Sequence, residues 1–268
     1  MDDGSTDDTL NKVKCLSCRY SNVRYVSLSR NFGHQSALKA GLDLACGNCV
    51  ISIDSDMQHP ADLIPCMLEK YEEGYEVVYT LRREDQRLPL IKRKTSGFFY
   101  SLINRLSDVK IEKGSADFRL LSDRVVNIIR NLPEHDLFFR GLSKWVGFRQ
   151  IGLEYEPLER FSGTSKYTLK KMLNFALFGI SSFSTRPLYI AAYLGFIFSF
   201  LSLLYLPYVI YSYFFGYTIS GWASVIVTIA FFGGVQLMIL GIIGVYIGRL
   251  FIQSKNRPVY IIRESNLQ

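Results

Sequence analysis

Short apolar runs alternate with helical stretches in the first part of the chain. The runs at 23–29, 49–56 and 75–81 are rich in apolar and β-branched residues, which is typical of strands. Residues 33–47 and 61–74 carry apolar positions at helical spacing, and each stretch ends at a glycine. Strands that alternate with helices indicate an α/β fold with a mostly parallel sheet that helices cover on both sides.

Two more helices are expected farther along the chain. Residues 91–107 are basic at first and then aromatic, and residues 122–132 have apolar positions at helical spacing. Ser122 or Asp123 is a suitable N-cap for the second helix, because either side chain can accept a hydrogen bond from a free backbone N–H.

A long uncharged stretch follows. From Pro187 to Gly248 the chain contains no Asp, Glu, Lys or Arg. One membrane crossing needs ~20 residues, so the stretch predicts two transmembrane helices, about 188–213 and 222–248, joined by the loop 214–222. A buried helical hairpin in a soluble protein is the alternative. It is disfavoured because neither helix has a polar face.

Basic residues flank this hairpin and are absent from its loop. They are Lys166, Lys170, Lys171 and Arg186 before it, and Arg249, Lys255 and Arg257 after it. The positive-inside rule therefore predicts that both termini are cytoplasmic in a multi-pass plasma-membrane protein, and the first residues do not read as a signal peptide. Residues 165–186 have apolar positions at helical spacing with early lysines, which favours an amphipathic interfacial helix over a core-packed one.

The predicted organisation has four parts. A catalytic-type α/β domain covers 1–164, the interfacial helix 165–186, the transmembrane hairpin 187–250 and a cytoplasmic tail 251–268.

Charge and cysteine content exclude some functions. The net charge is +7, but no basic stripe with interleaved aromatic residues appears, so nucleic-acid binding is not expected. Cys15 and Cys18 form one CxxC pair, and Cys46 and Cys49 form another, which resembles zinc-ligand spacing. The gap between the pairs is longer than usual, so free cytosolic thiols are the favoured interpretation.

The stretch "SIDSDMQHP" carries the candidate chemistry. Asp54 and Asp56 are one residue apart at the carboxyl end of a predicted strand, where open α/β sheets bind ligands. Alternation places both carboxylates on one side, and Gln58 and His59 follow on the same turn. Two hard oxygen ligands suit Mg²⁺ or Mn²⁺ bound to a diphosphate. As a bare pattern Asp-x-Asp is weak, because such pairs also cap helices.

Five motifs in order carry a resemblance. They are "DDGSTDDT", "LSRNFGHQSALKAGLD", "DSDMQHP", "GSADFRL" and "RFSGTSKY", followed by the two membrane helices. This arrangement resembles the family-2 glycosyltransferases of the polyprenyl-phosphate type. It is similar to the undecaprenyl-phosphate glucosyltransferases and, more distantly, to dolichol-phosphate mannose synthase. The resemblance implies a GT-A-like (Rossmann-like) fold.

The resemblance also implies roles for individual residues. Those expected to meet the donor nucleotide are Asp2, Asp3, Arg30 and Asn31. The metal–diphosphate turn comprises Asp54, Asp56 and Gln58. The residues expected to hold phosphates are Arg119, Arg160, Ser165 and Lys166. Asp117 matches a carboxylate proposed as catalytic base or metal partner. The resemblance implies that the sugar acceptor is a phosphate monoester, whose second pKa is ~6. Such a phosphate is already a good nucleophile near neutral pH and has less need of a strong base, so we expect Asp117 mainly to orient other groups of the site.

The implied activity is transfer of a sugar from a nucleotide sugar to a polyprenyl phosphate, with glucose as the favoured sugar and UDP-glucose as the favoured donor. It would be inverting, would depend on Mg²⁺ or Mn²⁺, and would occur on the cytoplasmic face of the membrane, with homo-oligomerisation left open. A non-catalytic relative that binds a partner or a lipid phosphate is the alternative. A transporter is disfavoured, because the spans carry no intramembrane charge.

The first residues raise one more expectation. Relatives of this type carry a strand, a helix and a second strand before the Asp-Asp-Gly-Ser turn, whereas this sequence opens on that turn. The resemblance therefore implies an N-terminally truncated sheet, with little or no transferase activity and lower stability than a full-length relative.

Overall fold

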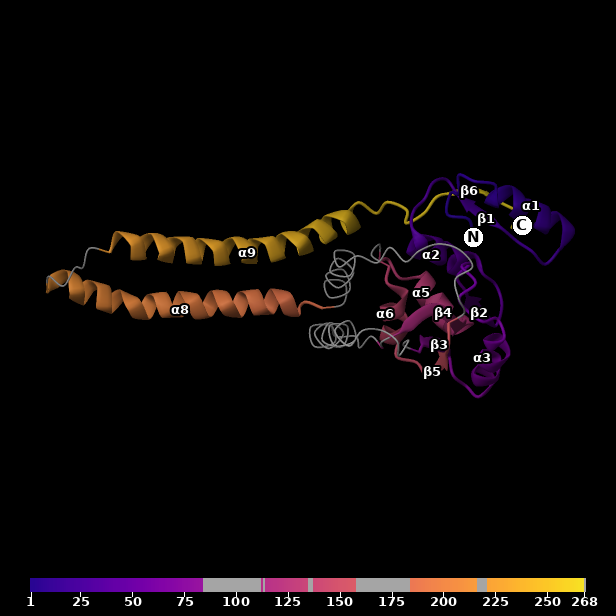
Figure 1. Ribbon diagram of the computed structural model, residues 1–268, viewed down its shortest axis with the longest axis horizontal. Coiled ribbons are helices and arrows are strands. Elements are labelled where there is room, and N and C mark those ends of the chain that lie inside the picture. Colours follow the sequence, from indigo (N-terminus) through magenta and orange to yellow (C-terminus); the bar gives the residue numbers. More distant parts are fainter. Residues whose placement is uncertain (84–111, 113, 135–136, 158–183, 216–220, 268) are drawn as a thin grey trace. The chain divides into compact units, whose positions relative to one another are not determined.

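The computed structural model describes residues 1–83, 112, 114–134, 137–157, 184–215 and 221–267, drawn as coloured ribbon in Figure 1. These residues form two units. The first comprises Met1–Phe183 with Asn256–Gln268, and the second is Ser184–Lys255. The helix predicted at 91–107 lies outside the described residues, as does nearly all of the interfacial helix predicted at 165–186.

The predicted alternation of strands and helices is confirmed in the first unit. The strands β1, β2 and β3 span Val26–Leu28, Cys49–Ser52 and Val77–Arg82. The helices α1, α2 and α3 span Thr9–Arg19, His34–Leu44 and Leu63–Glu72. The predicted cap is also present, because the side chain of Ser122 accepts a hydrogen bond from the backbone N–H of Val125 at the start of α5 (Asp123–Arg130).

The main sheet is mixed, which corrects the expectation of a mostly parallel one. Its strand order is β2-β4-β3-β5, where β4 is Ser115–Ser122 and β5 is Gln150–Tyr155. β4 runs antiparallel to both neighbours, and only β3 and β5 are parallel. The sequence analysis did not identify β4, because Asp117 and Arg119 interrupt its apolar pattern with charge.

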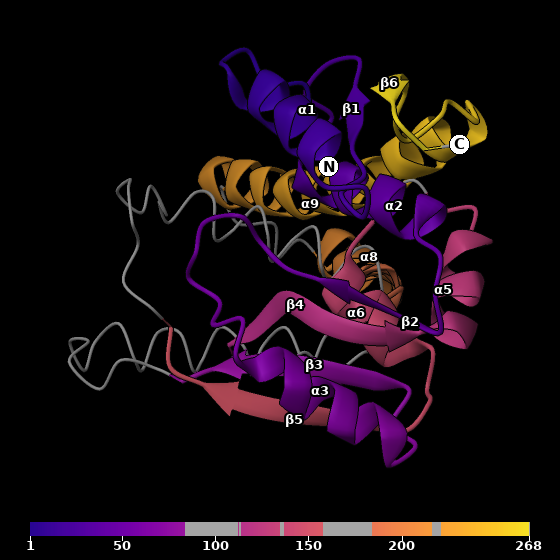
Figure 2. The same cartoon turned by 90° about the vertical axis from the view of Figure 1, so that its right-hand side faces the viewer.

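Apolar side chains pack on both faces of this sheet. Val77 and Leu121 belong to a buried cluster with residues of α5 and of α6 (Phe139–Trp145). Val78 and Leu120 point the other way and pack with Met67 of α3, the helix that lies in front of the sheet in Figure 2. β3 and β4 are therefore buried on both faces, and polar side chains on these strands need partners inside the protein.

The segment after the second long helix adds a strand that the sequence analysis missed. β6 (Ile262–Ser265) pairs antiparallel with β1, and Figure 1 shows the two side by side. On its other side, β1 is linked to Asp2 through a parallel bridge at Ser27. The Tyr260 hydroxyl donates to Asp43 Oδ2 of α2 at 3.0 Å. The predicted tail thus contributes a strand and a hydrogen bond to the first unit.

The second unit consists of two long helices, α8 (Arg186–Phe214) and α9 (Trp222–Ser254). Both are long and apolar enough to cross a membrane. Pro207 lies inside α8, and Phe198 of α8 contacts the rings of Phe231 and Phe232 edge-on. α9 extends beyond the predicted end at residue 248, because no helix-breaking residue follows before Ser254.

Removing residues 260–268 should loosen β1. The backbone N–H of Ser29 donates to the Ile261 carbonyl, and that of Tyr25 donates to Asn266 Oδ1, so deletion frees both amides. Hydrogen exchange of peptides covering 25–29 should accelerate by at least about tenfold, while β3 stays protected. The substitution Arg263→Ala, which keeps the strand backbone, is the matched control. Unchanged exchange at 25–29 in the truncated chain would refute this role of β6.

Candidate active site

Two carboxylates meet at one edge of the main sheet. β2 ends at Ser52, which is paired with Arg119 of the antiparallel strand β4. Continuing this register by two residues places Asp54 opposite Asp117. The Ser52 hydroxyl also donates to the backbone carbonyl of Asp117. Antiparallel pairing therefore brings together two residues that are far apart in the sequence.

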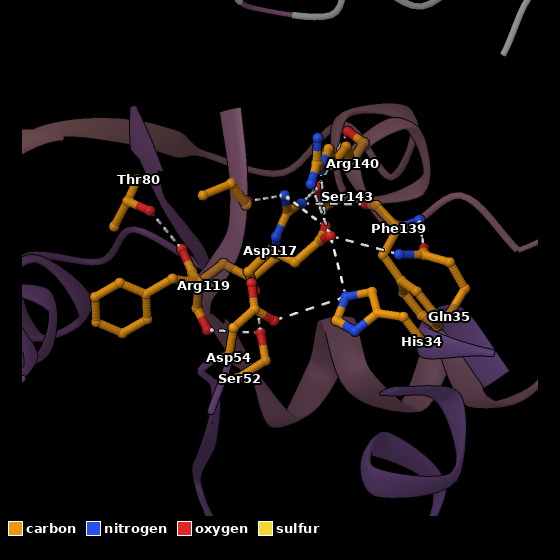
Figure 3. Close-up of polar contacts among 12 residues, drawn as sticks. His34, Gln35, Ser52, Asp54, Thr80, Asp117, Arg119, Phe139, Arg140 and Ser143 are labelled. Carbon is orange, nitrogen blue, oxygen red and sulfur yellow. Dashed lines mark hydrogen bonds and ion pairs between the residues drawn. The ribbon is translucent and has the colours of Figure 1, made fainter. Parts of the chain in front are cut away.

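The Asp117 carboxylate is buried, 3% exposed, and accepts hydrogen bonds from several directions (Figure 3). Arg140 of α6 binds it with two nitrogens at 3.1 and 3.0 Å, and His34 Nε2 and Gln35 Nε2 lie 3.3 and 3.4 Å from Oδ2. Burial acts to raise the pKa of Asp117. The hydrogen bond from His34 and the charges of Arg140 and Arg119 outweigh it and hold the pKa well below its usual range.

His34 lies between the two carboxylates, as Figure 3 shows. Its Nε2 is 3.3 Å from Asp117 Oδ2 and 3.7 Å from Asp54 Oδ1. The hydrogen bond to Asp117 and the two negative charges raise the pKa of His34 against the opposing effect of burial. His34 is the first residue of α2, and this helix packs against β1, so the backbone of His34 is held in place. The two carboxylates thus stabilise the protonated form of His34.

Arg119 was expected to hold a phosphate, and the structure gives its guanidinium other partners. It is 1% exposed. It donates to the carbonyls of Ala116 and Phe139 and to the Ser143 hydroxyl. Burial lowers the pKa of Arg119 to about 10. Arg140, whose side chain is 30% exposed, is the more accessible cation beside Asp117.

The residues predicted to meet the nucleotide are brought together around one loop. Asp3 accepts hydrogen bonds from the backbone N–H groups of Phe32 and Gly33 at 2.7 and 2.9 Å. Gly4 has φ +66°, and a Cβ there would lie 2.4 Å from the Arg30 carbonyl carbon. The Asp-Asp-Gly turn therefore fits closely against the loop that carries Arg30 and Asn31.

Asp2 has a structural role in the same region. Its carboxylate accepts from the Ser27 hydroxyl at 2.6 Å and from the Ser5 backbone N–H at 3.1 Å. Burial acts to raise the pKa of Asp2, but these hydrogen bonds outweigh it and lower the pKa. The carboxylate thus ties the first turn of the chain to β1.

The turn after β2 carries the predicted metal residues. Asp56 Oδ1 accepts from the backbone N–H of Gln58, whose side chain is buried. Asp54 Oδ2 lies 3.2 Å from His59 Nε2. Met57 between them has φ 60°, a left-handed conformation that side chains other than glycine seldom adopt. This conformation turns the chain so that Gln58 and His59 point inward.

The donor set at this turn suits a metal shared with a substrate. Among the described residues, no three His, Cys, Asp or Glu side chains are arranged as a metal site. Mg²⁺ is commonly bound by one or two carboxylates together with substrate phosphates, and Asp54 and Asp56 fit that mode. The five cysteines are free thiols, and within the described part of the chain they form no such group either.

A cavity of about 500 Å³ adjoins the two carboxylates. His34, Asp54 and Asp117 line it together with apolar side chains of α2 and β2. Residues from both ends of the first unit complete the lining, among them Met1, Arg24, Tyr25 and Leu267. The remaining predicted phosphate residues, Arg160, Ser165 and Lys166, lie outside the described residues.

Sequence reasoning missed three side chains of this site: His34, Gln35 and Arg140. The first two lie inside the motif "LSRNFGHQSALKAGLD", which was quoted but used only for Arg30 and Asn31. No local signal pointed to Arg140, because its link to Asp117 depends on how α6 packs on β4.

Comparisons with known proteins agree with the motifs. Residues 1–128 match the family described as "Glycosyl transferase family 2". The chain is 43% identical over 267 residues to the "SfII prophage-derived bactoprenol glucosyl transferase" of Shigella flexneri, covering 99% of this chain and 86% of that protein. It is 42% identical over 266 residues to the "Uncharacterized glycosyltransferase YkcC" of Bacillus subtilis, covering 99% and 82%. It is 40% identical over 264 residues to the "Prophage bactoprenol glucosyl transferase homolog" of Escherichia coli, covering 98% and 86%.

Asp117→Asn should lower the pKa of His34, because it removes the negative charge that stabilises the imidazolium. In the unaltered protein the His34 pKa should exceed the ordinary value of about 6.5. Its contribution to stability is then present below that value and is lost as the pH rises through the raised pKa. NMR titration of the ring protons in EDTA measures the shift, with the exposed Asp62→Asn as control. Equal His34 pKa values in all three proteins would refute the coupling.

Proposed function

This chain belongs to glycosyl transferase family 2, and we propose that it transfers glucose from UDP-glucose to a polyprenyl phosphate. The observation that carries the proposal is the Asp54–His34–Asp117–Arg140 cluster at the sheet edge, in a chain that also has two helices of membrane-spanning length. The relatives named bactoprenol glucosyl transferases support the lipid acceptor.

The donor would bind between the loop after β1 and the turn after β2. The loop that Asp3 fixes presents Arg30 and Asn31 to the nucleotide. Asp54 and Asp56 would hold Mg²⁺ or Mn²⁺ against the diphosphate. The bound ion would neutralise negative charge on the departing UDP. The protein's own part is to fix both carboxylates at the end of β2.

The acceptor phosphate needs little help to become a nucleophile. With a second pKa of ~6 it is largely a dianion near neutral pH. Asp117 already accepts hydrogen bonds from Arg140, His34 and Gln35, so its role is to hold those groups rather than to accept a proton. Arg140, and His34 when it is protonated, are the groups that would orient the anionic phosphate.

The reaction would proceed in one displacement with inversion. A phosphate oxygen of the lipid forms a bond to the anomeric carbon of glucose, on the face opposite the leaving group. The bond from that carbon to the UDP oxygen breaks, and its electron pair leaves with UDP. The products are a polyprenyl phosphate glucose with inverted configuration and free UDP.

The membrane topology follows from charge. Arg186 is the first residue of α8, Arg249 lies in the last two turns of α9, and Lys255 and Arg257 follow α9, whereas residues 215–221 carry no charge. We therefore place both termini and the first unit in the cytoplasm, where UDP-sugars are available and where the acceptor's phosphate can reach the site while its tail stays in the bilayer.

Asp56→Asn should reduce transfer by about 10²-fold or more, because one charged ligand of the diphosphate-bound metal is lost. The assay follows label from UDP-glucose into lipid, with the purified chain in nanodiscs, undecaprenyl phosphate and Mn²⁺. The exposed Asp62→Asn should remain active. Activity of Asp56→Asn equal to that of the unaltered chain would contradict the metal assignment, and transfer of label from a different nucleotide sugar but not from UDP-glucose would contradict the proposed donor.

Cysteine labelling tests the topology. In a background with all five cysteines replaced by serine, Phe215→Cys should react with an impermeant thiol reagent on intact cells, and Arg257→Cys should not. Both should react after permeabilisation, which serves as the control. The opposite pattern on intact cells, or equal labelling of the two, would overturn the assignment.

A further inference from the structure

A buried histidine outside the Asp54–His34–Asp117–Arg140 cluster connects Asp54 to the far strand of the sheet. His59 Nε2 lies 3.2 Å from Asp54 Oδ2, and His59 Nδ1 lies 2.8 Å from the Tyr155 hydroxyl. The His59 side chain is 7% exposed, and Tyr155 at the end of β5 is also buried. The three side chains form a hydrogen-bonded row from β5 to the turn after β2.

The chemistry of the two ends determines the proton positions in this row. The Asp54 carboxylate offers an acceptor oxygen 3.2 Å from His59 Nε2, so the proton of this hydrogen bond lies on the nitrogen. Burial raises the pKa of Tyr155, so the phenol keeps its proton. His59 therefore carries its proton on Nε2 and donates it to Asp54, while Nδ1 accepts the hydroxyl proton of Tyr155.

Packing against two aromatic rings fixes the orientation of the His59 imidazole. The His59 ring centroid lies 5.3 Å from that of Phe118 and 5.5 Å from that of Tyr155. Phe118 is fully buried on β4, between Asp117 and Arg119. The imidazole is thus held between a residue of β4, the strand that carries Asp117, and a residue of β5, and it cannot turn away from Asp54 without losing both contacts.

We propose that His59 and Tyr155 are positioning residues that orient the Asp54 carboxylate, with Oδ2 bound to His59 and Oδ1 directed toward His34 and the donor diphosphate. The inference rests on the proposed function, in which Asp54 meets the metal–diphosphate. Asp54 lies beyond the end of β2 in a turn, where the main sheet does not hold its side chain. A hydrogen bond from a fixed donor selects one orientation before the donor substrate arrives.

The first test examines the row without metal or substrate. Nitrogen-15 NMR of histidine-labelled protein at pH 8 in EDTA should show His59 as the neutral Nε2–H form. Tyr155→Phe should move the Nδ1 resonance, since that nitrogen loses its donor. A proton on Nδ1, with or without one on Nε2, would overturn the inference. An Nδ1 resonance that does not shift in Tyr155→Phe would also overturn it.

The second test measures UDP affinity by calorimetry with Mn²⁺ and again in EDTA. His59→Leu should weaken Mn²⁺-dependent binding about 10–100-fold, the usual effect of losing a group that orients a metal ligand. His59→Gln should restore most of it, because its amide N–H can reach Asp54. Tyr155→Phe should show a smaller loss, and affinity in EDTA should not change. Tyr71→Phe, which loses a hydroxyl bond to the Asn48 carbonyl, is the matched control.

The outcomes separate the two proposals. If the unaltered protein binds UDP equally with and without Mn²⁺, the metal–diphosphate role of Asp54 fails, although the NMR result can still stand. If Mn²⁺ strengthens UDP binding equally in the unaltered protein, His59→Leu and Tyr155→Phe, and Tyr155→Phe leaves the Nδ1 resonance unchanged, the positioning role fails. Should His59→Leu not fold, Tyr155→Phe decides the question through its affinity and its NMR shift.

Discussion

The buried carboxylate of Asp117 is the constraint that organises the first unit. A charge inside a sheet covered on both faces is tolerated only when it is paired and hydrogen-bonded. Its partners come from three places: Arg140 on α6, His34 and Gln35 at the start of α2, and Arg119 on β4 itself. Each partner fixes the element that carries it, so satisfying one charge also sets the positions of two helices against the sheet.

Arg119 extends this constraint into the core. Two residues along β4 from Asp117, it lies on the same side of the strand and is more deeply buried. Its guanidinium binds the Phe139 carbonyl and the Ser143 hydroxyl, both on α6. The same helix carries Arg140, so α6 is attached to β4 at both charged positions. An apolar pair in β4 would pack at least as well, but it would leave no anion to hold His34 and Arg140 at the sheet edge.

The sequence predicted those parts of the fold that depend on local pattern. The strand before Asp54, the cap at Ser122 and both long apolar helices have local signals, and all are present. The sequence analysis did not predict β4 and β6, because their pairing partners are distant in the chain and charged residues interrupt their apolar pattern. The site divides in the same way. The Asp-x-Asp turn, which also carries His59, could be recognised from the sequence, whereas Arg140 and Tyr155 join it only through packing between elements far apart in the chain.

The loop after β1 illustrates how much of the candidate site is non-local. Residues 29–33 are held on one side by Asp3 and Gly4, near the start of the chain, and on the other by the Ile261 carbonyl, which accepts from the Ser29 N–H. The last contact is made by residues that follow α9. Loop-closure entropy opposes contacts of such sequence separation, so the native geometry of this loop is complete only when the chain has returned from its second long helix. The loop at 29–33 therefore depends on residues that follow the two long helices in the chain. These helices thus take part in the folding of the site, in addition to being candidates for a membrane anchor.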